Sequence, residues 1–152
     1  MIRSDIKSIA LGGPGATFVM TLLMLIAPVM GMPKMWIGNM LAHFLRVPVY
    51  VGWIVHFIIG TLIAGNYVFL FSVRFHFAPA LKGLVFSLIP FLMAQTLIFP
   101  MMGAGFFSAR TPAPFLFALG SLIGHLVYGA VLGYLVAELR TTGSATNEQP
   151  GL

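Results

Sequence analysis

The chain contains no cysteine, and only three of its residues are acidic. The absence of cysteine excludes disulfides, thiolate metal sites and cysteine nucleophiles. The three acids, Asp5, Glu138 and Glu148, lie outside the long apolar stretches, so no buried carboxylate can act as a general base or in a proton relay. The glycine-rich segment 11–15 lacks the lysine and the preceding strand of a phosphate-binding loop. We therefore expect a protein that is not an enzyme.

Charged residues are scarce throughout. They make up 7% of the chain, against 59% hydrophobic residues and a mean hydropathy of +1.01, whereas a soluble domain carries about 25% charged residues. The formal net charge of +5 comes from scattered lysines and arginines. Because no basic cluster of the kind that nucleic acid requires is present, we expect no nucleic-acid partner. Isolated basic residues suit anionic headgroups, so membrane lipids are the expected surroundings.

Four uncharged stretches divide the sequence. Each is longer than the roughly 20 residues that span a hydrocarbon core, and uninterrupted apolar stretches of this length are not barrel strands. We therefore expect an all-α membrane protein with four transmembrane helices, forming one bundle over residues 1–140. The small, polar segment 141–152 is expected to be a disordered cytoplasmic tail. The four stretches are 8–33, 47–73, 83–109 and 111–137.

Lysine and arginine are divided unequally between the two sides of such a bundle. The side that holds both termini carries Arg3, Lys7, Arg74, Lys82 and Arg140, and the other side carries Lys34, Arg46 and Arg110. This excess predicts that both termini are cytoplasmic. We expect a multi-pass protein of the bacterial cytoplasmic (inner) membrane.

A short amphipathic segment separates the first two stretches. Trp36, Met40 and Phe44 recur at a spacing of four, whereas His43 falls on the opposite side. This pattern predicts a short interfacial helix in the first outer loop, lying on the membrane surface. His43 and His76 both fall in interfacial segments, and we expect them to be solvated.

Two blocks of similar sequence indicate an internal repeat. The pattern Leu-Ile-x-Pro-x-Met-Gly occurs at 25–31 and again at 97–103. A histidine followed by small residues at a spacing of four occurs at His56 and again, at nearly the same offset, at His125. Matching blocks in the same order predict a duplicated two-helix hairpin, and the two copies are expected to be parallel repeats because each contains two spans. The repeats are predicted at about 8–73 and 83–137.

Small residues mark the faces on which the helices are expected to touch, because they let helix backbones approach closely in membranes. We expect the second and fourth spans to meet, with His56 and His125 facing each other or the bundle interior. Pro28 and Pro100, in the repeated block, are expected to bend the first and third helices near their outer ends. The small residues are Gly60, Ala64, Gly129 and Gly133.

The intramembrane histidines leave several interpretations open. As structural residues they would form hydrogen bonds between helices, and Gln95 and Thr96 on the third helix are at a suitable depth to be their partners. As cofactor ligands they would hold haem b or another tetrapyrrole between the second and fourth helices. A sandwiched ring would separate these helices beyond the 8–10 Å of ordinary packing, whereas the small residues predict a close crossing.

Copper is a further possibility. Imidazole and thioether groups both suit copper, and the repeat-equivalent Met30 and Met102 could complete a site with His56 and His125. Methionine is also a common filler of apolar interiors. Both interpretations therefore stay open for the methionines.

The repeated block, with a histidine in the span that follows it, resembles small four-helix bacterial membrane proteins in families without an assigned function. The resemblance concerns the layout of nearly the whole chain and implies no active site. We expect a structural or accessory component of a membrane assembly, working with other membrane subunits or as a homo-oligomer. The alternatives are an electron-transfer protein that holds haem through His56 and His125 and, third, a small-solute channel or carrier.

Overall fold

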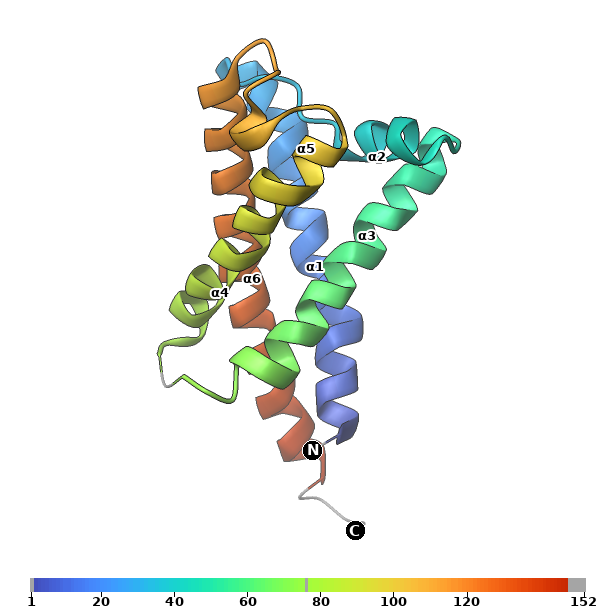
Figure 1. The fold of residues 1–152 in the computed structure, drawn as a ribbon. Helices are drawn as coiled ribbons and strands as arrows, with labels where there is room; N and C mark the ends of the chain where they lie inside the picture. Colours follow the sequence, from blue (N-terminus) through green and yellow to red (C-terminus); the bar gives the residue numbers. More distant parts are fainter. Residues whose placement is uncertain (1, 76, 148–152) are drawn as a thin grey trace.

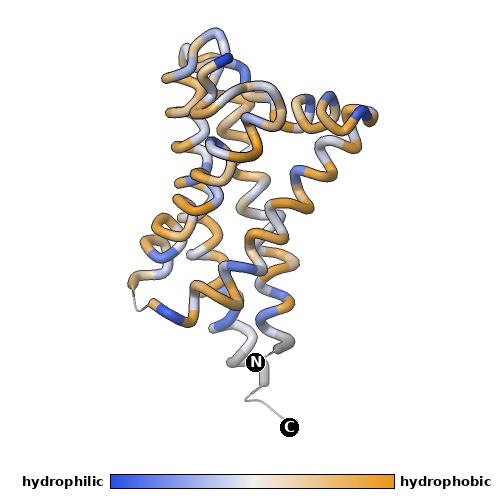
Figure 2. Tube along the Cα trace, in the orientation of Figure 1, coloured by the Kyte–Doolittle hydropathy of each residue, from blue (hydrophilic) through white to orange (hydrophobic). Residues whose placement is uncertain are grey.

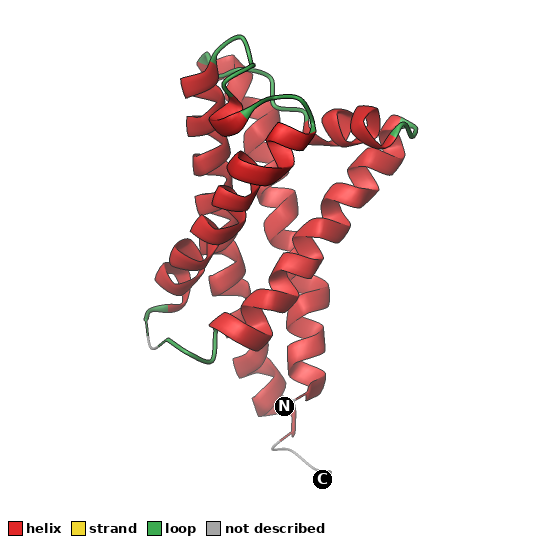
Figure 3. Cartoon of the chain, viewed as in Figure 1, coloured by secondary structure: helices red, strands yellow, loops and turns green. Residues whose placement is uncertain are grey.

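The computed structural model describes residues 2–75 and 77–147, so the prediction for His76 lies outside the described residues. The regular structure in these ranges is entirely helical (Figure 3). Four helices are long and apolar enough to cross a membrane, which confirms the predicted all-α fold and agrees with a multi-pass membrane protein. The four spans are Ser4–Met30, Val49–Phe71, Pro79–Met101 and Pro114–Gly143.

Each span contains one long helix (Figure 1), and short helical segments continue three of them. The first is α1 (Ile2–Ile26) with the 3-10 helix η1 (Ala27–Met30), and the second is α3 (Val49–Asn66) with the π-helix η2 (Tyr67–Phe71). The third is α4 (Pro79–Met93) with the π-helix η3 (Ala94–Ile98) and α5 (Phe99–Met101), and the fourth is α6 (Pro114–Asn147). The loops hold α2 (Ile37–Leu45) and η4 (Phe106–Ser108).

Helix α6 continues through 141–147, the first part of the segment predicted as a disordered tail, and 148–152 lie outside the described residues. Its end lies at the same end of the bundle as the start of α1 (Figure 1).

The long helices expose apolar side chains on their outer faces. Figure 2 shows hydrophobic residues along most of their length, and Ile54, Ile58 and Leu62 of α3 are all exposed. An exterior of this kind is expected where hydrocarbon rather than water surrounds the protein.

Two pairs of helices, α1 with α3 and α4 with α6, are joined by the contact between α1 and α6, which is more extensive than the contact between α1 and α3. At the end that holds the start of α1, the Arg140 guanidinium forms an ion pair with Asp5 at 2.8 Å and donates to Ser72 Oγ at 3.1 Å. These bonds connect α6 with both α1 and the end of the second span. Helix α2 packs against the first turns of α3, where a Cβ on Gly52 would overlap Gly38.

Small residues form the closest contacts within each pair. Gly83 and Gly129 meet between α4 and α6, where a Cβ on either glycine would overlap the carbonyl oxygen of the other. Between α1 and α3, a Cβ on Gly13 would lie 3.1 Å from Ala64 Cβ, and one on Gly60 would lie 3.1 Å from Thr17 Cβ. The small faces of α3 and α6 therefore lie against α1 and α4. This differs from the expectation that the second and fourth spans meet along them.

The two proline blocks end their spans with the same backbone geometry. Gly31 N donates to Pro28 O at 3.2 Å, and Gly103 N donates to Pro100 O at 3.0 Å. Both glycines have positive φ, 84° and 88°, a conformation that glycine adopts without strain. Pro28 and Pro100 each lie at the start of a short terminal helix, where proline's preset φ favours the helical turn.

Substitution of Gly129 by Ala tests the close contact between α4 and α6. The added Cβ would lie 2.6 Å from Ser87 Cβ, so the helices have to separate. We expect a loss of about 1–3 kcal/mol in stability, as for other overpacked cores, seen as a lower midpoint of thermal unfolding in detergent. Gly65→Ala is the matched control, because a Cβ at Gly65 has no neighbour within 4 Å. Equal midpoints for both variants would contradict the contact.

Candidate functional site

A cavity of about 310 Å³ lies between the four spans, and residues of α2 and α5 also line it. All four spans contribute to its wall, which is predominantly apolar. Both intramembrane histidines line it, so the structure brings His56 and His125 to one site although α3 and α6 belong to different pairs. The lining residues are Thr17, Met20, Met24, Met35, Ile37, Leu41, His56, Ile59, Gly60, Ile63, Pro90, Met93, Ala94, Ile98, Phe99, Ser121, His125 and Tyr128.

We infer that the mouth of this cavity lies between α3 on one side and α4 with η3 on the other, because these segments carry its most exposed lining residues. Three lining side chains are substantially exposed on the outer surface: Ile59 (40%), Met93 (53%) and Ile98 (37%). All three belong to segments that are apolar enough to cross a membrane. The cavity therefore opens toward the apolar exterior of the bundle.

His56 is buried and is held by the first span. Its Nε2 lies 3.1 Å from Thr21 Oγ1, and the Thr21 hydroxyl donates to Thr17 O at 2.7 Å. Because a hydroxyl has a single proton, Thr21 accepts from His56, and Nε2 carries the imidazole proton. Trp53 and Phe57 pack edge-to-face around the ring at 6.0 and 5.8 Å between centroids. His56 thus has a fixed orientation and a satisfied Nε2.

His125 has the opposite tautomer. Its Nδ1 lies 2.7 Å from Ser121 O, and since a carbonyl oxygen can only accept, Nδ1 carries the proton. Nε2 is then an acceptor with no hydrogen-bond partner among the described residues. The Phe91 ring packs against the imidazole at 5.9 Å between centroids. An imidazole anchored through Nδ1 with a free Nε2 is also the arrangement of many metal-ligating histidines.

Ser121, one turn before His125 on α6, is 2% exposed and lines the cavity. Its hydroxyl has no hydrogen-bond partner. Most buried polar side-chain groups have one, so this hydroxyl is an exception.

Tyr128 joins α6 to α3 at the cavity wall. Its hydroxyl donates to Gly60 O at 2.6 Å, and the side chain is buried. This bond spans the space between helices of different pairs, and Gly60 leaves room for it because no side chain covers its carbonyl.

The prediction that Gln95 and Thr96 are the hydrogen-bond partners of the histidines is wrong. Gln95 Oε1 accepts from Ser108 Oγ at 3.0 Å, and Thr96 donates to Leu92 O within its own helix. Neither residue lines the cavity. Gln95 lies on the π-helix η3 and is directed toward η4, because the wider turn changes which face each residue occupies.

The two methionines of the predicted copper site do not line the cavity. Met30 is 77% exposed, and Met102 packs against the hydrophobic core. Four other methionines line it instead. Within residues 2–75 and 77–147, no group of three or more histidines and acids lies together in a way that could hold a metal ion. The four lining methionines are Met20, Met24, Met35 and Met93.

No sequence pattern singles out Thr21, which holds His56, or the lining residues Ser121 and Tyr128. Thr17 and Thr21 are spaced by four, which places them on one helix face, but threonines in membrane helices usually bond within their own helix. Tyr128 lies three residues after His125, and that spacing alone predicts a shared face. No signal in the sequence identifies the unpartnered hydroxyl of Ser121.

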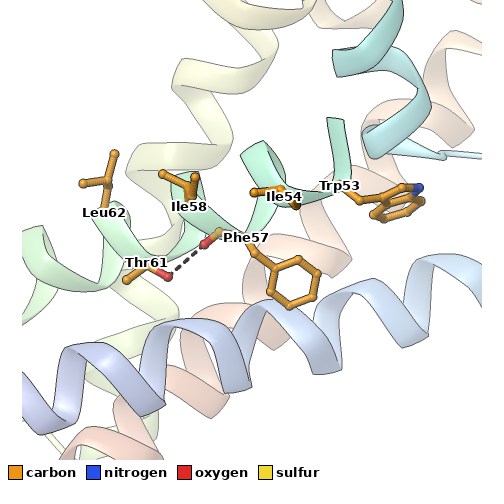
Figure 4. A pocket seen from close by; sticks show the side chains of 6 residues that line it. All are labelled: Trp53, Ile54, Phe57, Ile58, Thr61 and Leu62. Atoms are coloured by element: carbon orange, nitrogen blue, oxygen red, sulfur yellow. Dashed lines mark hydrogen bonds between the residues drawn. The ribbon is translucent and has the colours of Figure 1, made fainter. Parts of the chain in front are cut away.

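A second hollow of about 450 Å³ is an open groove on the outer face of α3 (Figure 4). Its hydroxyl-bearing side chain, Thr61, donates to Phe57 O at 2.8 Å. The indole of Trp53 is the other polar group among its lining residues. It is lined by Trp53, Ile54, Phe57, Ile58, Thr61 and Leu62.

Comparison with known protein families gives a match over most of the chain. The model of a family described as a protein of unknown function (DUF2938) matches residues 37–139. This range contains α2 and α3, the third span, and the part of α6 that holds Ser121 and His125. No curated protein and no solved structure matches the chain.

Replacing Thr21 by Val tests the bond that holds His56. The change keeps the shape of the side chain and removes the hydroxyl, leaving the buried Nε2–H without a partner. We expect a loss of about 1–3 kcal/mol in stability, measured as a lower thermal midpoint in detergent. Thr96→Val is the control, because its exposed hydroxyl bonds only within its own helix. Identical midpoints would show that Thr21 does not hold the imidazole.

Proposed function

The chain belongs to the DUF2938 family of proteins of unknown function, and we propose that it is a non-catalytic membrane protein that binds a small, mostly apolar ligand between its four spans. The observation that carries the proposal is the cavity of about 310 Å³ into which His56 and His125 both project from different helix pairs. Ligand sites are typically apolar hollows with a few convergent polar groups, and this cavity matches that description.

The position of the cavity mouth supports uptake from the bilayer. Ile59 and Met93 are exposed at the mouth, and both lie in spans long and apolar enough to cross a membrane. A ligand that enters between them leaves hydrocarbon rather than water. The proposal therefore favours a molecule that partitions into lipid, and it makes a channel for polar solutes the weaker alternative.

We further propose that the two halves are parallel repeats. Gly13 and Thr17 of α1 contact α3, and Gly83 and Ser87, at corresponding positions of α4, contact α6 in the same way. The proline blocks lie at a slightly larger offset than these glycines and end alike. The π-helix η3 lies between these two points in the second half, and its wider turn takes up additional residues.

The membrane placement follows from the same layout. We propose that α2 lies at the outer interface, because Phe44 and Leu45 are exposed on it while Leu41 is buried at the cavity. The excess of basic residues then leaves both termini in the cytoplasm, in a bacterial inner membrane. In that setting the protein would act alone or as an accessory subunit of a membrane assembly.

Haem ligation by the two histidines is a second candidate, favoured by one observation. His125 is anchored through Nδ1 and has a free Nε2, as an axial ligand requires. His56 lacks this arrangement, because its Nε2 donates to Thr21. Ligation by both histidines would require the His56–Thr21 bond to break, so the ligand-binding proposal has better support than a bis-histidine haem.

Blocking the cavity mouth tests the proposed function. In Ile59→Trp the larger side chain narrows the opening, and in Leu62→Trp the same side chain points to the exterior away from the cavity. Native mass spectrometry of protein released from mild detergent is expected to show a bound small molecule in the unaltered protein and in Leu62→Trp, and a loss of at least about tenfold in occupancy in Ile59→Trp. Equal occupancy in all three proteins would contradict the site.

An optical spectrum separates the two candidates. Protein purified from cells that make haem is expected to show no Soret band, oxidised or reduced, and no stoichiometric iron or copper. A Soret band that disappears in both His56→Ala and His125→Ala would establish the haem instead. Stoichiometric copper lost in the same two variants would establish a metal site.

A further inference from the structure

We propose that the ligand of the cavity is an uncharged alcohol with a flexible hydrocarbon chain, and that its hydroxyl group is bound between Ser121 Oγ and His125 Nε2. This inference rests on the proposed function and adds the chemical class of the ligand.

The two groups have complementary hydrogen-bonding needs. Ser121 Oγ has a proton to donate, no partner and almost no accessible surface, so the hydroxyl of a ligand reaches it when the flexible methionines of the wall move aside. In the neutral imidazole, His125 Nε2 has a lone pair because Nδ1 carries the proton. The residues are four apart on α6, so their side chains are neighbours on one helix face. A hydroxyl group satisfies both at once, since its oxygen accepts from Ser121 while its proton is donated to His125.

The free hydroxyl of Ser121 contrasts with most other hydroxyls of the long helices, that of Ser8 excepted. Thr17, Thr21, Thr61 and Ser87 each donate to a carbonyl oxygen of the preceding turn. A buried unpaired polar group costs about 1–3 kcal/mol. A ligand that supplies the missing partner would recover this free energy, which gives the site a reason to prefer an oxygen-bearing ligand.

Among the described residues, one unpaired buried polar atom belongs to a residue that lines the cavity. Among the described residues, three buried side-chain atoms have no partner, on Ser8, Gln95 and Ser121, and of these residues only Ser121 lines the cavity. Of the remaining lining polar side chains, Thr17 bonds within α1 and Tyr128 bonds to Gly60, whereas His56 bonds to Thr21 through Nε2 and keeps Nδ1 as an acceptor. Among the described lining residues, Ser121 therefore supplies the unpaired buried donor.

The lining set also excludes a charged head group. It contains no lysine, arginine, aspartate or glutamate. With both imidazoles neutral, a carboxylate or phosphate buried here would have no opposite charge to offset its desolvation, which costs several kcal/mol. The lining therefore favours a neutral head group.

The wall suits a flexible chain better than a rigid ring. Met20 and Met24 come from α1, Met35 from the loop before α2, and Met93 from α4. Methionine side chains are unbranched and adjust their rotamers to irregular apolar partners. The exposed Ile59 and Met93 at the mouth allow the far end of a chain to extend into the surrounding lipid.

Three probes of one carbon skeleton test the inference: farnesol, its methyl ether and the hydrocarbon farnesene. The alcohol donates and accepts, the ether only accepts, and farnesene does neither. Apparent affinities are measured by native mass spectrometry titration of the full-length protein in mild detergent. We expect farnesol to bind about tenfold or more tightly than farnesene, with the ether between them, as two hydrogen bonds of ordinary strength predict.

Two variants assign the contacts. Ser121→Ala is expected to weaken farnesol and the ether alike by about fivefold, the value of one hydrogen bond, and to leave farnesene unchanged. His125→Leu is expected to weaken farnesol to the level of the ether and to leave the ether unchanged. Ser87→Ala, a buried serine outside the cavity, is the control and should change none of the three affinities. Because the Ser121 hydroxyl has no partner to lose, Ser121→Ala should fold even if His125→Leu does not. Its effect on the three affinities is then sufficient to test the contact with the ligand hydroxyl.

The outcomes separate this inference from the proposed function. If all three probes bind equally and Ile59→Trp abolishes this binding, the alcohol head group is overturned and the apolar cavity remains in place. Absence of binding by any probe, or binding that Ile59→Trp leaves unchanged, would overturn both. A farnesol preference that survives in Ser121→Ala would overturn the assignment of the hydroxyl to this pair.

Discussion

The close approach of helix backbones at glycine determines the arrangement of this protein. Where Gly83 meets Gly129, neither position has room for a side chain, so α4 and α6 are held together. Gly13 and Gly60 allow a similarly close contact between α1 and α3. With α1 also packed on α6, the two pairs form a continuous unit in which α3 and α4 have no comparably extensive contact. The cavity, which all four spans line, reaches between these two helices.

The surrounding hydrocarbon determines which polar groups of the cavity need a hydrogen-bond partner within the protein. In water an unpaired serine hydroxyl exchanges partners with solvent, but inside a bilayer the protein must supply the partner or bear the cost. Most hydroxyls here meet that requirement through their own helix, and Tyr128 and His56 meet it through a neighbouring helix. Against this background, the unsatisfied Ser121 beside a free His125 nitrogen distinguishes one end of the cavity as the place for a polar group of a ligand.

The long uncharged stretches predict the four spans well, because charge inside hydrocarbon is costly and the length of a span is fixed by the bilayer. The same patterns identify His56 and His125 as the residues of interest. They do not predict the pairing of the helices, because a face of small residues on α3 indicates that a close contact exists but not which helix makes it. The partner of His56 is a threonine on the preceding span, far from it in the chain, and the lining methionines resemble ordinary core residues.

The most direct measurement is an electron cryomicroscopy map of the protein in lipid nanodiscs, with a bound antibody fragment to aid alignment. A ligand-binding cavity predicts elongated density between α3 and α4 that ends within hydrogen-bond distance of Ser121 Oγ and His125 Nε2 and reaches the lipid past Ile59. If instead the methionine side chains fill the space and the Ser121 hydroxyl bonds to the carbonyl oxygen of Phe117, the cavity is part of a closed core and the protein has no ligand site there.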